Sequence, residues 1–77
     1  MKVRVECYSG RKADERPLRF WLEGIEYRVE EVADQWYGPG AAFFKVLAGD
    51  GNLYILRQDQ SAAEGGWSLE AFRELNK

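Results

Sequence analysis

Apolar and polar side chains alternate in short runs along most of this chain, and turn-forming segments separate the runs. Residues 2–8 show the pattern most clearly, because Val3, Val5 and Cys7 alternate with charged side chains. A two-residue period places every second side chain on the same face of an extended strand. The pattern therefore predicts half-buried β-strands and a Cys7 side chain that points into the core.

Glycine-containing turns connect the predicted strands. A Glu-Gly pair at 23–24 separates two alternating runs, and the Gly-Asp-Gly-Asn segment at 49–52 separates two more. Such connections predict tight antiparallel hairpins, in which glycine adopts positive φ angles. The Gly-Pro-Gly segment at 38–40 predicts a further chain reversal. Polar stretches at 9–16 and 58–66 predict loops.

These elements predict an all-β fold for a single domain that spans residues 1–77. Five short strands with tight turns are typical of a small antiparallel SH3-like or partly open barrel or roll. Adjacent Glu30 and Glu31 interrupt the alternation, which predicts a β-bulge that bends the sheet. Residues 67–77 fit either a closing strand or a short C-terminal helix. We expect a strand-like entry at Trp67, followed by a helical turn.

The inward phases of the predicted strands define the expected core. Its members are Val3, Val5, Cys7, Phe20, Leu22, Val29, Val46, Ile55 and Leu56. Ile55 and Leu56 are adjacent and point to opposite faces, so burial of both requires cover on each side of their strand.

The chain contains no histidine and a single cysteine. This excludes the common histidine-based general bases and nucleophile pairs, and the His–Cys zinc sites. We therefore expect no enzymatic activity, no cofactor and no metal. Glu30 and Glu31 point to opposite faces of a regular strand and do not converge on a ligand. Asp34 shares a phase with Trp36, and its expected role is structural, as an acceptor for turn amides or Arg57.

Charge is distributed unevenly along the chain. The first 28 residues carry seven basic and five acidic side chains, whereas the remaining residues carry four and eight, for a net charge of −2. No apolar run approaches the ~20 residues that a membrane-spanning helix needs. Cytoplasmic localisation is therefore expected, with no membrane partner.

Five short motifs follow one another along the chain. They are Phe20-Trp21-Leu22-x-Gly24, Val29-x-x-Val32-x-Asp34-x-Trp36-Tyr37, Phe44-Lys45-Val46-x-Ala48-x-Asp50-Gly51, Tyr54-Ile55-Leu56-Arg57-x-Asp59 and Trp67-x-Leu69. In this pattern the chain resembles a functionally uncharacterised bacterial family of small β domains, over roughly residues 2–72. Similar domains are appended to the C-terminus of some translesion DNA polymerases. The resemblance implies an all-β fold and an association with nucleic acid, and it assigns no site residues.

Trp21 is the first candidate for a binding residue. It lies out of phase with Phe20 and Leu22, so we expect it on the outer face of its strand. A solvent-facing tryptophan near arginine suits base stacking or a protein hot spot. In the alternative, a loop or the C-terminal segment covers the ring.

Basic residues on outward phases of the first strands are the second candidate. Arg4, Arg19 and Arg28 converge if these strands are neighbours, and such a stripe would follow a phosphate backbone. In the alternative, the arginines form ordinary cross-strand pairs with Glu6, Glu23 and Glu26.

The sequence therefore predicts a binding module for single-stranded DNA or RNA, in a repair or translation setting. The alternative is a module for protein interaction or self-association that uses Trp21, Tyr37 and Phe43.

Overall fold

The computed structural model describes residues 2–8, 16–60 and 66–75. In this part of the chain every regular element is a strand, and no helix could cross a membrane. The strands are β1 (Arg4–Tyr8), β2 (Arg16–Leu22), β3 (Ile25–Gly38), β4 (Ala41–Ala48), β5 (Leu53–Asp59) and β6 (Gly66–Arg73). They form one antiparallel sheet in the order β1-β2-β3-β4-β5-β6, curled into a half-barrel. The predicted all-β class is confirmed.

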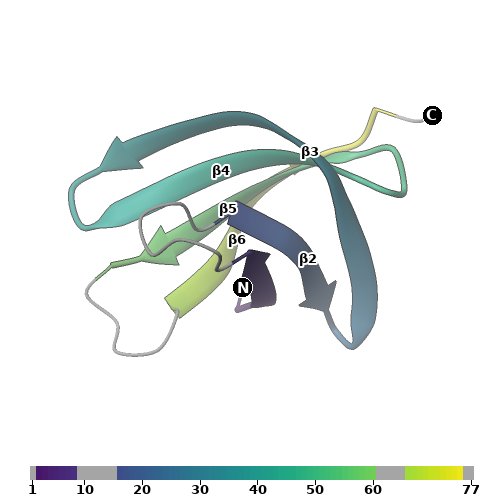
Figure 1. The fold of residues 1–77 in the computed structure, drawn as a ribbon, viewed down its shortest axis with the longest axis horizontal. Coiled ribbons are helices and arrows are strands. Elements are labelled where there is room, and N and C mark those ends of the chain that lie inside the picture. The colour runs from purple at the N-terminus through teal and green to yellow at the C-terminus, as the bar shows by residue number, and fades with distance from the viewer. Residues whose placement is uncertain (1, 9–15, 61–65, 76–77) are drawn as a thin grey trace.

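The longest strand, β3, belongs to both halves of the sheet. Its residues 25–28 pair with β2, whereas residues 29–38 pair with β4. Register shifts between Val29 and Glu31 and between Val32 and Asp34 mark two bulges, which increase bend and twist. Figure 1 shows β3 arching over the molecule between these two halves. The bulge predicted at Glu30 and Glu31 is confirmed.

The curl brings the two ends of the sheet together. Lys2 forms a bridge with Ser68 of β6, and the Val3 amide donates a hydrogen bond of 3.2 Å to the Trp67 carbonyl. β1 therefore lies beside the start of β6, and the barrel closes over a short stretch.

The predicted turns are confirmed. Leu22 pairs with Ile25 across Glu23 and Gly24, both of which have positive φ angles. The Pro-Gly pair at 39–40 reverses the chain between β3 and β4, and segment 49–52 joins β4 to β5. The predicted loops at 9–16 and 58–66 fall largely outside the described residues, although β5 extends to Asp59.

The C-terminal prediction of a helical turn is wrong, because residues 66–73 form a sixth strand. Leu69 and Phe72 are three residues apart, a spacing that suggested a helix. In the structure, Leu56 pairs with Leu69 whereas Ile55 pairs with Ala71, so the sheet bulges at Glu70. One extra residue therefore produces a three-residue spacing on one face of a strand.

The core lies on the concave face. Its buried cluster consists of Phe20, Ala42, Phe44, Val46, Ala48, Tyr54, Leu56 and Trp67. Of the predicted core, Phe20, Val46 and Leu56 are fully buried. Val3, Val5, Cys7, Leu22 and Val29 are half-buried and pack against this cluster. Ile55 is half-buried and points to the outer face, in the phase opposite to Leu56.

A bulge also changes which residue of β2 faces inward. The register shifts between Glu6 and Cys7, so that Cys7 lies opposite Pro17. Pro17 is buried, whereas Leu18 is 41% exposed, although it is two residues before Phe20 and would share the inward face of Phe20 in a strand without a bulge.

Candidate functional site

Trp21 lies on the outer face of β2, as predicted. Its neighbour Phe20 is fully buried, and the alternation of the strand therefore turns Trp21 outward. Arg4 lies opposite Trp21 in the β1–β2 register, and its guanidinium carbon is 4.8 Å from the centroid of the indole ring. This cation–π contact covers one face of the ring. Trp21 is half-buried.

Arg19 bridges two carboxylates on the same outer face. Its Nε lies 3.0 Å from Glu6 Oε1, and its Nη1 lies 3.0 Å from Glu26 Oε2. The predicted alternative of cross-strand pairing therefore holds for Arg19, with Glu6 and Glu26 as its partners. These groups are about half exposed, so the pairs add little stability, but they neutralise the arginine.

Arg28 lies opposite Arg19 in the β2–β3 register and is exposed. Within the described part of the chain its side chain forms no ion pair. Arg4, Arg19 and Arg28 thus share one face of neighbouring strands, as the sequence predicted. Of these three arginines, Arg4 and Arg28 form no ion pair with a carboxylate in the described part of the chain.

Phe43 and Tyr37 lie on opposite faces of the sheet, so they do not form one surface. Phe43 stacks on Trp36, with ring centroids 5.6 Å apart and an interplanar angle of 6°. Tyr37 lies opposite buried Ala42, in the inward phase at the open end of β3, and is 67% exposed. Its hydroxyl accepts a hydrogen bond of 2.7 Å from Gln35 Nε2.

The register connects these features into one row across the outer face. Trp36 pairs with Phe43, Phe43 with Arg57, Arg57 with Ser68, and Ser68 with Lys2. Lys2 and Arg4 are two residues apart on the same exposed phase of the N-terminal segment, and Arg4 contacts Trp21. We call this row the outer belt. It consists of Trp36, Phe43, Arg57, Ser68, Lys2, Arg4 and Trp21.

The outer belt places cations between aromatic groups. Lys2, Arg4 and Arg57 carry no ion pair among the described residues. Trp36 and Phe43 lie at one end and Trp21 at the other. The sequence indicated Arg4, Trp21 and Phe43, but it did not indicate Lys2, Trp36 or Arg57. These residues join the row only because β1 meets β6, a contact between distant segments.

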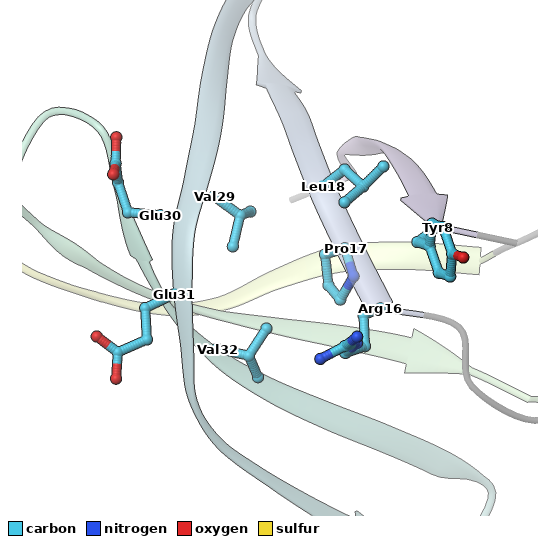
Figure 2. Close-up of a pocket in the computed structure, with 8 residues that line it drawn as sticks. All are labelled: Tyr8, Arg16, Pro17, Leu18, Val29, Glu30, Glu31 and Val32. Atoms are coloured by element: carbon cyan, nitrogen blue, oxygen red, sulfur yellow. The ribbon is translucent and has the colours of Figure 1, made fainter. Parts of the chain in front are cut away.

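Glu30, Glu31 and Asp34 lie along β3. No group of three potential ligands for a metal occurs in the described part of the chain. The bulge places Glu30 and Glu31 on the same side of β3, away from Val29 and Val32, so the prediction of opposite faces is wrong (Figure 2). Asp34 pairs with Lys45 in the register, and its Oδ1 accepts a hydrogen bond of 2.8 Å from the Gln35 amide rather than from Arg57.

Asp50 makes the strongest polar contacts of the described turns. The Tyr54 hydroxyl donates a hydrogen bond of 2.6 Å to Asp50 Oδ2, and the Asn52 amide donates one of 3.0 Å to Oδ1. Partial burial raises the pKa of Asp50, but these hydrogen bonds outweigh it, and the pKa lies below its ordinary value. The role of this carboxylate is to fix the turn between β4 and β5.

Comparison of the chain with protein-family models, curated proteins and solved structures found no match. The described residues form a small antiparallel half-barrel, and the outer belt runs around its outside from β3 through β4, β5, β6 and β1 to β2.

Proposed function

We propose that this protein is a non-enzymatic module that binds single-stranded nucleic acid along its outer belt. The supporting observation is the row of Lys2, Arg4 and Arg57 between Trp36 and Trp21. Cations contact phosphates, and indole rings stack on bases of any sequence. The resemblance to the tail domains of translesion polymerases favours the same ligand, and a bacterial cytoplasm is its proposed location.

The belt has suitable dimensions for several nucleotides. It crosses six strands, and neighbouring strands are about 4.8 Å apart, so its length is on the order of 24 Å. Each end offers an aromatic surface. Phe43 stacks on one face of Trp36, and Arg4 covers one face of Trp21, which helps to hold each ring in place. On the other side of Trp21, the register places Glu26 of β3.

We expect weak binding that depends on salt. The net charge of −2 opposes long-range attraction of a polyanion, so a dissociation constant in the micromolar range or above is expected at physiological salt. Contacts from the three belt cations give a slope of log affinity against log salt of about −2 for a single strand.

The test is titration of fluorescein-labelled oligo-dT and oligo-rU, followed by anisotropy at two salt concentrations. Trp21→Ala should weaken binding by about 1–3 kcal/mol, the contribution of one stacking platform. Arg57→Ala should reduce the salt slope by about 0.7, because one phosphate contact is lost. Arg73→Ala is the matched control. Arg73 lies on β6, next to the strand of Arg57, but it is opposite Leu53 and five residues beyond Ser68, so its loss should leave the salt slope unchanged.

Absence of any salt-sensitive binding at high micromolar protein would exclude this function. The belt would then be assigned to protein interaction or self-association, which apolar contacts drive and salt weakens little.

A further inference from the structure

The sheet opens between β2 and β3, away from the outer belt. Direct pairing between these strands covers only Arg19–Leu22 and Ile25–Arg28. Beyond it, residues 16–18 of β2 pair with β1 alone, and residues 29–38 of β3 pair with β4 alone. Within the described part of the chain, two strand edges therefore face each other without a shared partner. Unpaired strand edges present backbone donors and acceptors to any further strand.

A cavity of about 530 Å³ fills this opening, within the range of ligand pockets. Figure 2 shows that Val29 and Val32 point from β3 into the cavity, with Pro17 and Leu18 across from them. These four residues make the facing walls apolar, whereas Tyr8 and Arg16 line the cavity beside them. The space between the facing walls accepts small apolar side chains.

The charge of the β3 edge defines the partner. Glu30, Glu31 and Asp34 lie along it, and no basic residue occurs between Arg28 and Lys45. Glu30 and Glu31 belong to the cavity lining and form no ion pair among the described residues, and Figure 2 shows their side chains on the opposite side of β3 from Val29 and Val32. A second copy paired through the same edge would bring like charges together, which destabilises adjacent strands. A cationic strand would gain from the same carboxylates.

We propose that the opening between β2 and β3 binds an extended segment of another protein in which apolar and basic residues alternate. The segment adds a strand to the β3 edge. Its apolar side chains enter the cavity beside Val29 and Val32, and its basic side chains lie on the face of Glu30 and Glu31. Strand addition derives affinity from backbone hydrogen bonds and specificity from alternate side chains.

The probe is an acetylated and amidated peptide of alternating valine and lysine, titrated into the full chain labelled with nitrogen-15. Amide shifts should concentrate at Arg16, Leu18 and residues 29–34. The matched peptide of valine and glutamate should bind about tenfold more weakly, because like charges replace opposite ones. A lysine peptide with N-methyl groups on every backbone nitrogen should lose binding, because both of its edges lack the N–H donors that extend a sheet.

Charge reversal on the protein provides the second arm. Glu31→Lys should weaken binding of the lysine peptide several-fold and favour the glutamate peptide. Glu23→Lys, in the exposed β2–β3 turn, is the control. This variant should still bind the lysine peptide more tightly than the glutamate peptide. Equal binding of both peptides, unchanged binding after N-methylation, or shifts confined to the outer belt would overturn the proposal. Concentration-dependent shifts at 29–34 in the free protein would instead identify a second copy as the occupant.

Discussion

Tyr54 connects the turn between β4 and β5 to the core. Its ring is 4% exposed and packs against Phe20, Tyr27 and Phe72, while its hydroxyl binds Asp50. Burial and the neighbouring carboxylate raise the pKa of Tyr54 far above its ordinary value. The same hydrogen bond helps to lower the pKa of Asp50. One side chain thus serves both apolar packing and turn closure.

Tyr54→Phe keeps the ring and removes the hydroxyl. We expect the free energy of unfolding to fall by about 1 kcal/mol at neutral pH. The contribution of Asp50 is present above its unfolded pKa of 3.8 and is lost as pH falls through its lower folded pKa. That of Tyr54 is lost as pH rises above its unfolded value of 10.0. Urea unfolding across pH measures the free energy of unfolding. In Tyr54→Phe, this free energy should fall less at low pH and less at high pH than in the unchanged protein. Tyr27→Phe is the control, and equal behaviour of the two variants would contradict this role.

Leu56 and Ile55 test the two faces of β5. Leu56 is 0% exposed, whereas Ile55 is half-buried on the outer face. Leu56→Ala should lower the free energy of unfolding by about 2–5 kcal/mol, enough to unfold a domain of this size. Ile55→Ala should cost clearly less. Thermal unfolding followed by circular dichroism measures both, and equal losses would show that the inward phase of β5 is misassigned.

At the scale of the elements, bulges determine which predictions hold. Uninterrupted alternation predicted the phases of Val5, Phe20 and Trp21 correctly. In β2, a bulge turns Pro17 inward in place of Leu18. In β6, another bulge places Leu69 and Phe72 on the same face. A bulge adds one residue to one strand, and its position depends on the partner strand. The sequence of a single strand therefore does not define where the bulge lies.

The β2–β3 turn carries local strain that a substitution can relieve. Glu23 has a φ of 50° and Gly24 a φ of 83°, as a type I′ hairpin requires. Asparagine adopts positive φ more readily than glutamate. Glu23→Asn should therefore raise the free energy of unfolding by several tenths of a kcal/mol, and the midpoint of thermal unfolding should rise slightly. Glu23→Val, which disfavours positive φ, should lower it. The opposite order would contradict the turn assignment.

At the scale of the whole molecule, closure of the barrel creates the candidate site. The sequence predicted that Arg4, Arg19, Trp21 and Arg28 share one face if the first strands are neighbours, and the structure shows these strands paired. The predicted alternative, cross-strand pairing with Glu6 and Glu26, holds for Arg19. The sequence did not predict that Lys2 meets Ser68, a contact that spans almost the whole chain. The alternation within one strand predicts which face a side chain occupies. It does not predict which distant strands meet.

The most direct test of the outer belt is an amide chemical-shift titration of the nitrogen-15 labelled chain with oligo-dT at low salt. Shifts should follow the belt across the sheet. They are expected at the backbone amides of Lys2, Arg4, Trp21, Trp36, Phe43 and Arg57, and at the indole N–H of Trp21 and Trp36. Raising the salt should reverse them. Shifts confined to the opening between β2 and β3, or no shifts at millimolar oligonucleotide, would contradict the proposed nucleic-acid surface.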